Sequence, residues 1–168
     1  MRRLTAYLVA LTLVAAHQIE TPRASAVSPE PLAIVVNRSN PVDNLSLGEL
    51  RTIFLSGRSH WNNERRITLV MREPGEPERK TILHDVCGMN ENQLKTHVLH
   101  GLFTGEILVS PKVLATASGV RKFIFNVPGA IGYLRVSDVD DTVKVLRVDD
   151  LLPNDRGYKL RVQNQTGY

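Results

Sequence analysis

Continuous apolar runs alternate along the chain with segments in which apolar residues recur every three or four positions. The runs at 32–36 and 67–71 are rich in β-branched residues and are bounded by polar or turn-forming residues, so both predict buried strands. Residues 129–134 and 142–148 have the same character, and 113–116 predicts a shorter strand. The pattern therefore supplies the strands of one sheet.

Helical periodicity separates these strands. Ser46 followed by Glu49 is a capping box, and apolar residues behind it fall on one face, which predicts a helix over 47–55. Pro77 suits the first position of another helix, because its missing N–H has no partner there, and this helix runs to about Cys87. Each helix therefore begins at a recognisable signal.

Two further helices follow in the second half of the chain. Gly88 suits the left-handed residue that ends the helix before it, and Asn90 can cap the next one. That next helix carries an apolar face, and we expect it to form a tight pair with the preceding helix; the face consists of Leu94, Val98, Leu99 and Leu102. The last predicted helix covers 117–125.

The order of elements predicts the fold class. Strands separated by helices imply an α/β fold with a mostly parallel sheet flanked by helices. We assign residues 27–150 to this single domain. The segment 151–168 is polar and is expected to be a loose C-terminal tail.

The N-terminal segment has the plan of a signal peptide. Arg2 and Arg3 precede an apolar stretch over 4–16, which is too short for a membrane-spanning helix of about 20 residues. The pattern at 24–26, Ala-Ser-Ala, favours cleavage after Ala26, with a second candidate site after Ala16. Residues 1–26 thus predict export to the periplasm, with no membrane span in the mature chain.

Composition narrows the function classes. The net charge of the whole chain is +4, and removing 1–26, with three basic residues and one acidic residue, leaves +2. No basic run or basic-aromatic stripe remains, so we expect no nucleic-acid partner. Cys87 is the only cysteine, so an internal disulfide is excluded and the residue is interpreted as a small buried side chain.

Catalytic and metal-binding patterns are sparse. The sequence contains no nucleophile elbow, no His-Glu-x-x-His helix and no phosphate-cradling Walker loop, so we expect neither an enzyme nor a cofactor. His97 and His100 stand on one face of a predicted helix, with His84 as a conceivable third ligand. Histidines on amphipathic helices are usually ordinary polar residues, and we predict no metal site.

Four stretches resemble the phosphate-binding protein of the phosphate ABC transporter, a type II periplasmic binding protein. They are Leu-Ala-Ile-Val-Val-Asn at 32–37 with 39–42, the segment 45–57 followed by Trp61, residues 67–79, and Pro-Gly-Ala-Ile-Gly-Tyr at 128–133. Their order matches that of the family. The resemblance implies one lobe of a binding protein, because the glycine-rich turn of the other lobe has no counterpart here.

The resemblance also implies a ligand site. Arg72, Gly75 and Arg79 fit an Arg-x-x-Gly-Ser-x-x-Arg pattern, and Ser39 comes from the first similar stretch. Two guanidinium groups and the N–H groups of a helix N-terminus can bind phosphate without a metal. Glu76 departs from the pattern, because it stands where the family has serine and a carboxylate cannot donate a hydrogen bond.

Two interpretations of this loop remain open. In one, the loop binds phosphate or a related oxyanion, and the chain is an exported substrate-binding-type protein that works with a transporter protein. In the other, Glu76 caps its own helix, surface ion pairs neutralise the loop, and the chain is a periplasmic protein-interaction module that kept the fold but lost its ligand. A homodimer that rebuilds a cleft from two lobes is a third arrangement.

Overall fold

The computed structural model describes residues 29–162, so the predicted signal peptide lies outside the described residues. The strands are β1 (Glu30–Asn37), β2 (Asn44–Leu45), β3 (Thr68–Arg72), β4 (Lys112–Leu114), β5 (Ala130–Arg135), β6 (Val143–Val145), β7 (Arg147–Val148) and β8 (Arg161–Val162). The helices are α1 (Leu47–Phe54), α2 (Pro77–Thr81), α3 (Glu91–Thr104) and α4 (Ala117–Asn126), with the π-helical turn η1 (Ile82–Cys87) and the 3-10 turn η2 (Val136–Asp138).

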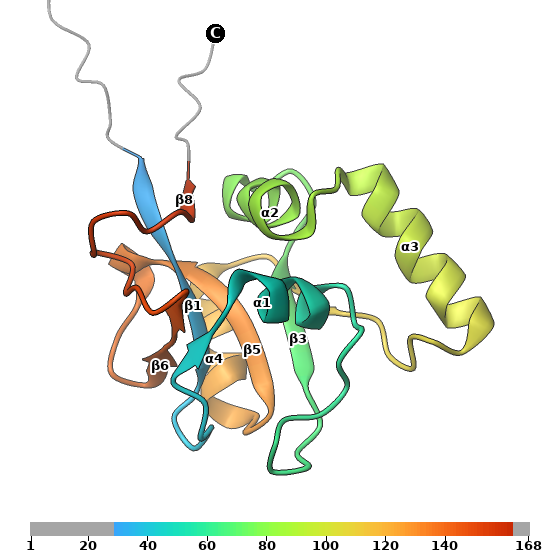
Figure 1. Cartoon of the computed structure of the whole chain (residues 1–168), viewed down its shortest axis with the longest axis horizontal. Helices are drawn as coiled ribbons and strands as arrows, with labels where there is room; N and C mark the ends of the chain where they lie inside the picture. Colours follow the sequence, from blue (N-terminus) through green and yellow to red (C-terminus); the bar gives the residue numbers. More distant parts are fainter. Residues whose placement is uncertain (1–28, 163–168) are drawn as a thin grey trace, which may run out of the picture.

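A central sheet in the order β4-β3-β5-β1-β6 organises the chain (Figure 1). β3 is parallel to both β4 and β5, whereas β1 runs antiparallel to both β5 and β6. The predicted α/β fold with a helix-flanked sheet is therefore confirmed. The expectation of a mostly parallel sheet is wrong, because β1 pairs antiparallel with β5, β6 and β8. The short strands β2 and β7 form a separate parallel pair.

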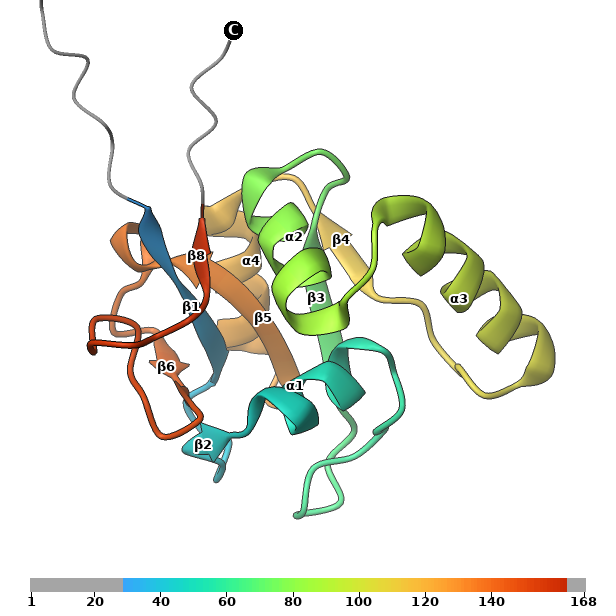
Figure 2. The same cartoon turned by 45° about the horizontal axis from the view of Figure 1, so that its top comes forward.

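Both faces of the sheet are covered, which explains why β1 is apolar from Leu32 to Val36. Leu32, Ile34 and Val36 face the core under α1, α2 and η1. Ala33 and Val35 face the core under α4, on the other side of the sheet (Figure 2). Because successive side chains of a strand point to opposite faces, a strand buried on both sides shows no polar alternation.

The capping box that begins α1 is present as predicted. The Ser46 hydroxyl accepts a hydrogen bond from the Glu49 backbone N–H at 3.2 Å, and the Glu49 carboxylate accepts from the Ser46 N–H at 2.9 Å. The Leu47 N–H donates to the Asp149 carboxylate at 2.9 Å. The first turn of α1 thus has partners for N–H groups that the helix itself cannot bond.

Replacing Ser46 with alanine is expected to lower the free energy of unfolding by about 1 kcal/mol, because the Glu49 N–H loses its acceptor. Urea unfolding monitored by circular dichroism measures this difference. Ser59→Ala is the control, since Ser59 is exposed and caps no helix, and we expect a change within about 0.5 kcal/mol. Equal effects of the two substitutions would contradict the capping role.

The predicted helix from Pro77 to Cys87 is confirmed, although its second half is π-helical. Gly88 ends it in the left-handed conformation with φ of 64°, and Asn90 caps α3. The predicted tight pair is wrong: α3 projects from the body of the protein in both views (Figures 1 and 2). The buried residues of α3 are Leu94 and Gly101, whereas Leu99 on its predicted apolar face remains 47% exposed.

The expectation of a loose tail is wrong for residues 151–162. Tyr158, Leu160 and Val162 are buried, and the Tyr158 hydroxyl donates to the Leu32 carbonyl at 2.8 Å. The Leu32 N–H in turn donates to the Leu160 carbonyl at 2.9 Å. Tyr158, Leu160 and Val162 stand two apart between polar neighbours and lead into β8, and the predominantly polar composition of the segment masks this pattern.

Candidate functional site

Four of the five predicted ligand residues meet at the C-terminal end of β3. Arg72 is the last residue of that strand. Gly75 lies in the following loop with φ of 95°, a conformation that favours glycine. Glu76 is the N-cap residue of α2, and Arg79 lies one turn further on. The strand and the helix together position these side chains.

Ser39 is not part of this group. β1 is antiparallel to β5, and β5 is parallel to β3, so the end of β1 lies beside the start of β3. The Ser39 hydroxyl there donates to the Asn37 side chain at 2.8 Å and accepts from Arg65 at 3.1 Å. The structure therefore places Ser39 and Arg72 at opposite ends of the sheet.

Arg72 is a largely buried cation that pairs with an acidic residue of the same loop. Its side chain is 11% exposed, and its Nη2 lies 2.8 Å from the Glu76 carboxylate. Its backbone N–H donates to the Tyr133 hydroxyl at 2.9 Å. The Nε atom of Arg72 is buried and has no hydrogen-bond partner among the described residues. Buried polar atoms rarely lack a partner, so this N–H is an open donor in the site.

Arg79 is engaged within the protein itself. Its side chain is 7% exposed, and its Nη1 donates to the Arg72 carbonyl at 2.8 Å. Its Nε donates to both carboxylate oxygens of Glu91, the first residue of α3, at 3.0 and 3.1 Å. Arg79 thus fixes the end of β3 and the start of α3 relative to each other. Sequence reasoning missed Glu91, because nothing local pairs it with Arg79.

Glu76 does not cap its own helix. Its φ and ψ are those of an N-cap residue, but its side chain makes no capping hydrogen bond. The carboxylate instead forms the ion pair with Arg72. Of the two interpretations of this loop, the ion pairing is found and the self-capping is not. The Glu76 carboxylate therefore occupies one side of the Arg72 guanidinium.

A second charged cluster supports the same helix. Arg135 in β5 pairs with Glu78, which is 8% exposed, and with Glu30 at 3.3 Å. Burial alone would raise the pKa of Glu30, but hydrogen bonds from Ser137 and the charge and hydrogen bond of Arg135 outweigh it, so this pKa lies below its ordinary value. Sequence reasoning missed this cluster, since its members come from three distant elements.

Other polar candidates have structural roles. The Trp61 indole N–H donates to the Gly129 carbonyl at 3.0 Å within the core. Burial raises the pKa of Tyr133, so its hydroxyl stays protonated beside Arg72. The His97 Nε2 lies 2.9 Å from the Leu55 carbonyl. Over residues 29–162, no three His, Cys, Asp or Glu side chains are grouped to hold a metal ion, and no helix is long and apolar enough to span a membrane.

Comparison with known proteins places this geometry in context. No protein-family model matches the chain. The phosphate-binding protein PstS of Bacillus subtilis is 29% identical over 127 residues, which cover 73% of this chain and 37% of that protein. The chain therefore spans well under half the length of this curated relative.

Solved structures agree on the fold. A phosphate ABC transporter substrate-binding protein from Clostridium perfringens, with bound phosphate, superposes with a TM-score of 0.65 at 21% identity, over 79% of this chain and 53% of that one. A phosphate transport receptor from Vibrio cholerae gives 0.60 at 23% identity, over 74% and 48%. The expected resemblance is confirmed. The chain is similar in sequence to a phosphate-binding protein and has the fold of about half of a phosphate ABC transporter substrate-binding protein.

Proposed function

We propose that this chain is an exported, periplasmic substrate-binding-type protein that binds phosphate or a related oxyanion at Arg72 and works with an ABC transporter. We expect the anion to bind reversibly and to leave chemically unchanged, because the similar proteins are phosphate-binding or substrate-binding proteins. The observation that carries the proposal is the buried Arg72 guanidinium. Within residues 29–162, its Nε is an open donor and its acidic partner is Glu76.

The guanidinium of Arg72 suits an oxyanion because its donors form a planar fork. Two phosphate oxygens can accept from Nε and Nη2 together, which gives a bidentate pair. Glu76 accepts from Nη2 alone in the structure, and it does not reach the Nε. A tetrahedral anion would thus satisfy a donor that the internal carboxylate leaves open.

Glu76 also sets the expected strength of binding. Its side chain is 37% exposed, so the carboxylate can swing into water at small cost when an anion enters. Phosphate must displace this negative charge before it reaches Arg72. We therefore expect weak binding in the natural sequence, and stronger binding once the carboxylate is replaced by a hydroxyl that can donate.

Isothermal calorimetry of the purified protein with phosphate and with sulfate tests the site. Glu76→Ser is expected to raise phosphate affinity about tenfold, because like-charge repulsion is removed and a donor is added, worth about 1.4 kcal/mol. Arg72→Lys keeps the charge but lacks the fork, and in the Glu76→Ser background it should lower affinity at least tenfold. Both variants must keep the wild-type circular dichroism spectrum.

Glu73→Ser is the matched control. Glu73 lies in the same loop and is exposed, and the substitution changes the net charge by the same amount without touching Arg72. We expect less than about a twofold change in affinity, the range of a screened surface charge. If both variants gained phosphate affinity equally, the gain would come from the change in net charge and not from Glu76 itself. Absence of phosphate binding by Glu76→Ser would refute the proposal.

A further inference from the structure

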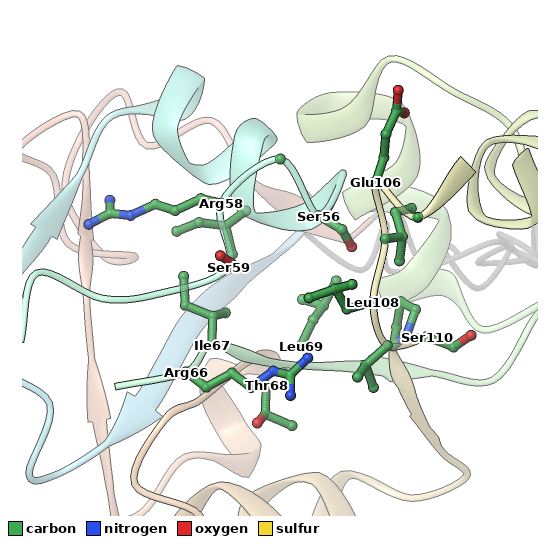
Figure 3. A pocket seen from close by; sticks show the side chains of 16 residues that line it. Ser56, Arg58, Ser59, Arg66, Ile67, Thr68, Leu69, Glu106, Leu108 and Ser110 are labelled. Atoms are coloured by element: carbon green, nitrogen blue, oxygen red, sulfur yellow. The ribbon is translucent and has the colours of Figure 1, made fainter. Parts of the chain in front are cut away.

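A hollow of about 410 Å³ lies at the other end of β3, away from Arg72. It is bordered by the end of α1, the start of β3 and the segment 105–111, as Figure 3 shows. The hollow has a clear cause in the sheet. β4 pairs with β3 only from Val70 to Arg72, and Pro111, just before β4, has no N–H to extend the ladder toward the start of β3.

The floor and one wall of the hollow are apolar. Ile53, Leu69 and Ile107 line it and belong to the buried core. On the wall formed by segment 105–111, Leu108 is 71% exposed and Val109 is 60% exposed. Adjacent large apolar side chains that face water beside a hollow are typical of a ligand-binding groove. These side chains offer an apolar chain a surface on one side of the hollow, and polar side chains line the rest.

Arg66 brings an available positive charge to this hollow. Among the described residues, the Arg66 side chain makes no hydrogen bond or ion pair, and in Figure 3 it extends from the start of β3 toward segment 105–111. Arg58 also lines the hollow, but it donates to the His60 carbonyl at 3.0 Å and stacks over Trp61. The Glu106 carboxylate points away from Arg66 in the same view.

We infer that this hollow binds an apolar chain ending in a carboxylate, with a medium-chain fatty acid as the ligand. The tail would lie over Ile53, Leu69 and Ile107, and the carboxylate would pair with Arg66, whose guanidinium matches carboxylate geometry. Ser56 also lines the hollow, and its hydroxyl can donate to a carboxylate oxygen. The site is independent of Arg72.

Titration with a chain-length series tests the tail. Hexanoate, octanoate and decanoate are added below their micelle concentrations, and binding is followed by calorimetry and by the fluorescence of Trp61, the only tryptophan. Each methylene that becomes buried should tighten binding by up to about fourfold. Leu108→Gln, at an exposed wall position, should flatten this dependence. Affinity independent of chain length would overturn the inference.

Comparison of octanoate with octanol tests the head group. The wild type should prefer octanoate by about tenfold, the effect of one charge-assisted hydrogen bond. Arg66→Ala should abolish this preference and leave octanol binding unchanged. Arg65→Ala is the matched control, because Arg65 is the neighbouring exposed arginine and bonds to Ser39 outside the hollow. A preference that survives Arg66→Ala, or vanishes in Arg65→Ala, would overturn the assignment.

Two further experiments distinguish a fatty acid from a peptide as the ligand, and this hollow from the site at Arg72. A short peptide with a C-terminal leucine carries the same chemistry, and if it bound at Arg66 more tightly than octanoate, the fatty acid would be rejected as the ligand. Phosphate at equal concentration should not displace octanoate, and Arg72→Lys should leave octanoate binding unchanged. Displacement of octanoate by phosphate would overturn the inference. If phosphate did not bind at all, the proposed function at Arg72 would fail and octanoate binding would be unaffected.

Discussion

Replacing Arg135 with methionine is expected to lower the free energy of unfolding by about 3 to 5 kcal/mol, the cost of leaving a buried charge without its partner. Arg135 is the cation beside Glu78, whose side chain is 8% exposed and whose Oε2 has no hydrogen-bond partner among the described residues. Methionine fills much of the volume of arginine, so the lower free energy of unfolding would come from the missing charge and not from a cavity. Urea unfolding followed by circular dichroism provides the measurement.

The double variant Arg135→Met/Glu78→Met distinguishes pairing from packing. Replacing both members of a buried pair with apolar residues is often close to neutral, so the double variant should recover most of the lost stability. Glu78→Met alone should also destabilise, because Arg135 would lose Glu78, which is more buried than its other partner Glu30 among the described ion pairs. Strictly additive effects of the two substitutions would contradict the expected coupling between the side chains.

The same cluster predicts a dependence on pH. Because the pKa of Glu30 is lowered in the folded protein, its contribution to stability is present above its ordinary pKa of about 4.3 and is lost as the pH falls through the lowered value. The stability difference between the wild type and Arg135→Met should therefore shrink when urea unfolding is repeated at acidic pH.

Gly129→Ala is expected to destabilise the protein by about 3 kcal/mol, the upper end of ordinary overpacking. A Cβ atom at this position would lie 2.0 Å from the backbone oxygen of Arg66, so one backbone segment must move. The Gly129 carbonyl accepts from the Trp61 indole and from the Thr68 N–H, both at 3.0 Å. A red shift of Trp61 fluorescence should accompany the lower urea midpoint.

Gly48→Ala serves as the control for this substitution. Gly48 lies in α1, and a methyl group at this position would have the Ser46 hydroxyl as its nearest neighbour, at 4.0 Å. Alanine is favoured over glycine inside a helix, so this variant should gain about 0.5 to 1 kcal/mol. If both glycine variants unfolded at the wild-type urea concentration, the close approach at Gly129 would be contradicted.

Local signals predicted the elements well because their causes are local. The Ser46–Glu49 capping box, the Pro77 helix start and the left-handed Gly88 all depend on residues within one turn of each other. The same holds for the grouping of Arg72 and Glu76, which are four residues apart. These features needed no knowledge of the tertiary fold.

What could not be predicted depends on strand direction and distant partners. An apolar run such as β1 does not reveal its direction, and that direction places Ser39 far from Arg72. The position of α3 could not be predicted either, since an apolar face does not identify its neighbour. The ion pair of Arg79 with Glu91 and the burial of Tyr158 likewise depend on tertiary contacts.

The pairing of β1 with β8 means that the packed unit begins and ends at one place. Glu30 lies opposite Val162, and Pro31 opposite Arg161, in an antiparallel pair. A unit whose two ends are adjacent can be inserted into a loop of another domain without stretching either connection. It can also be circularly permuted: a short linker would join the ends, and new termini could open in the exposed turn around Gly105.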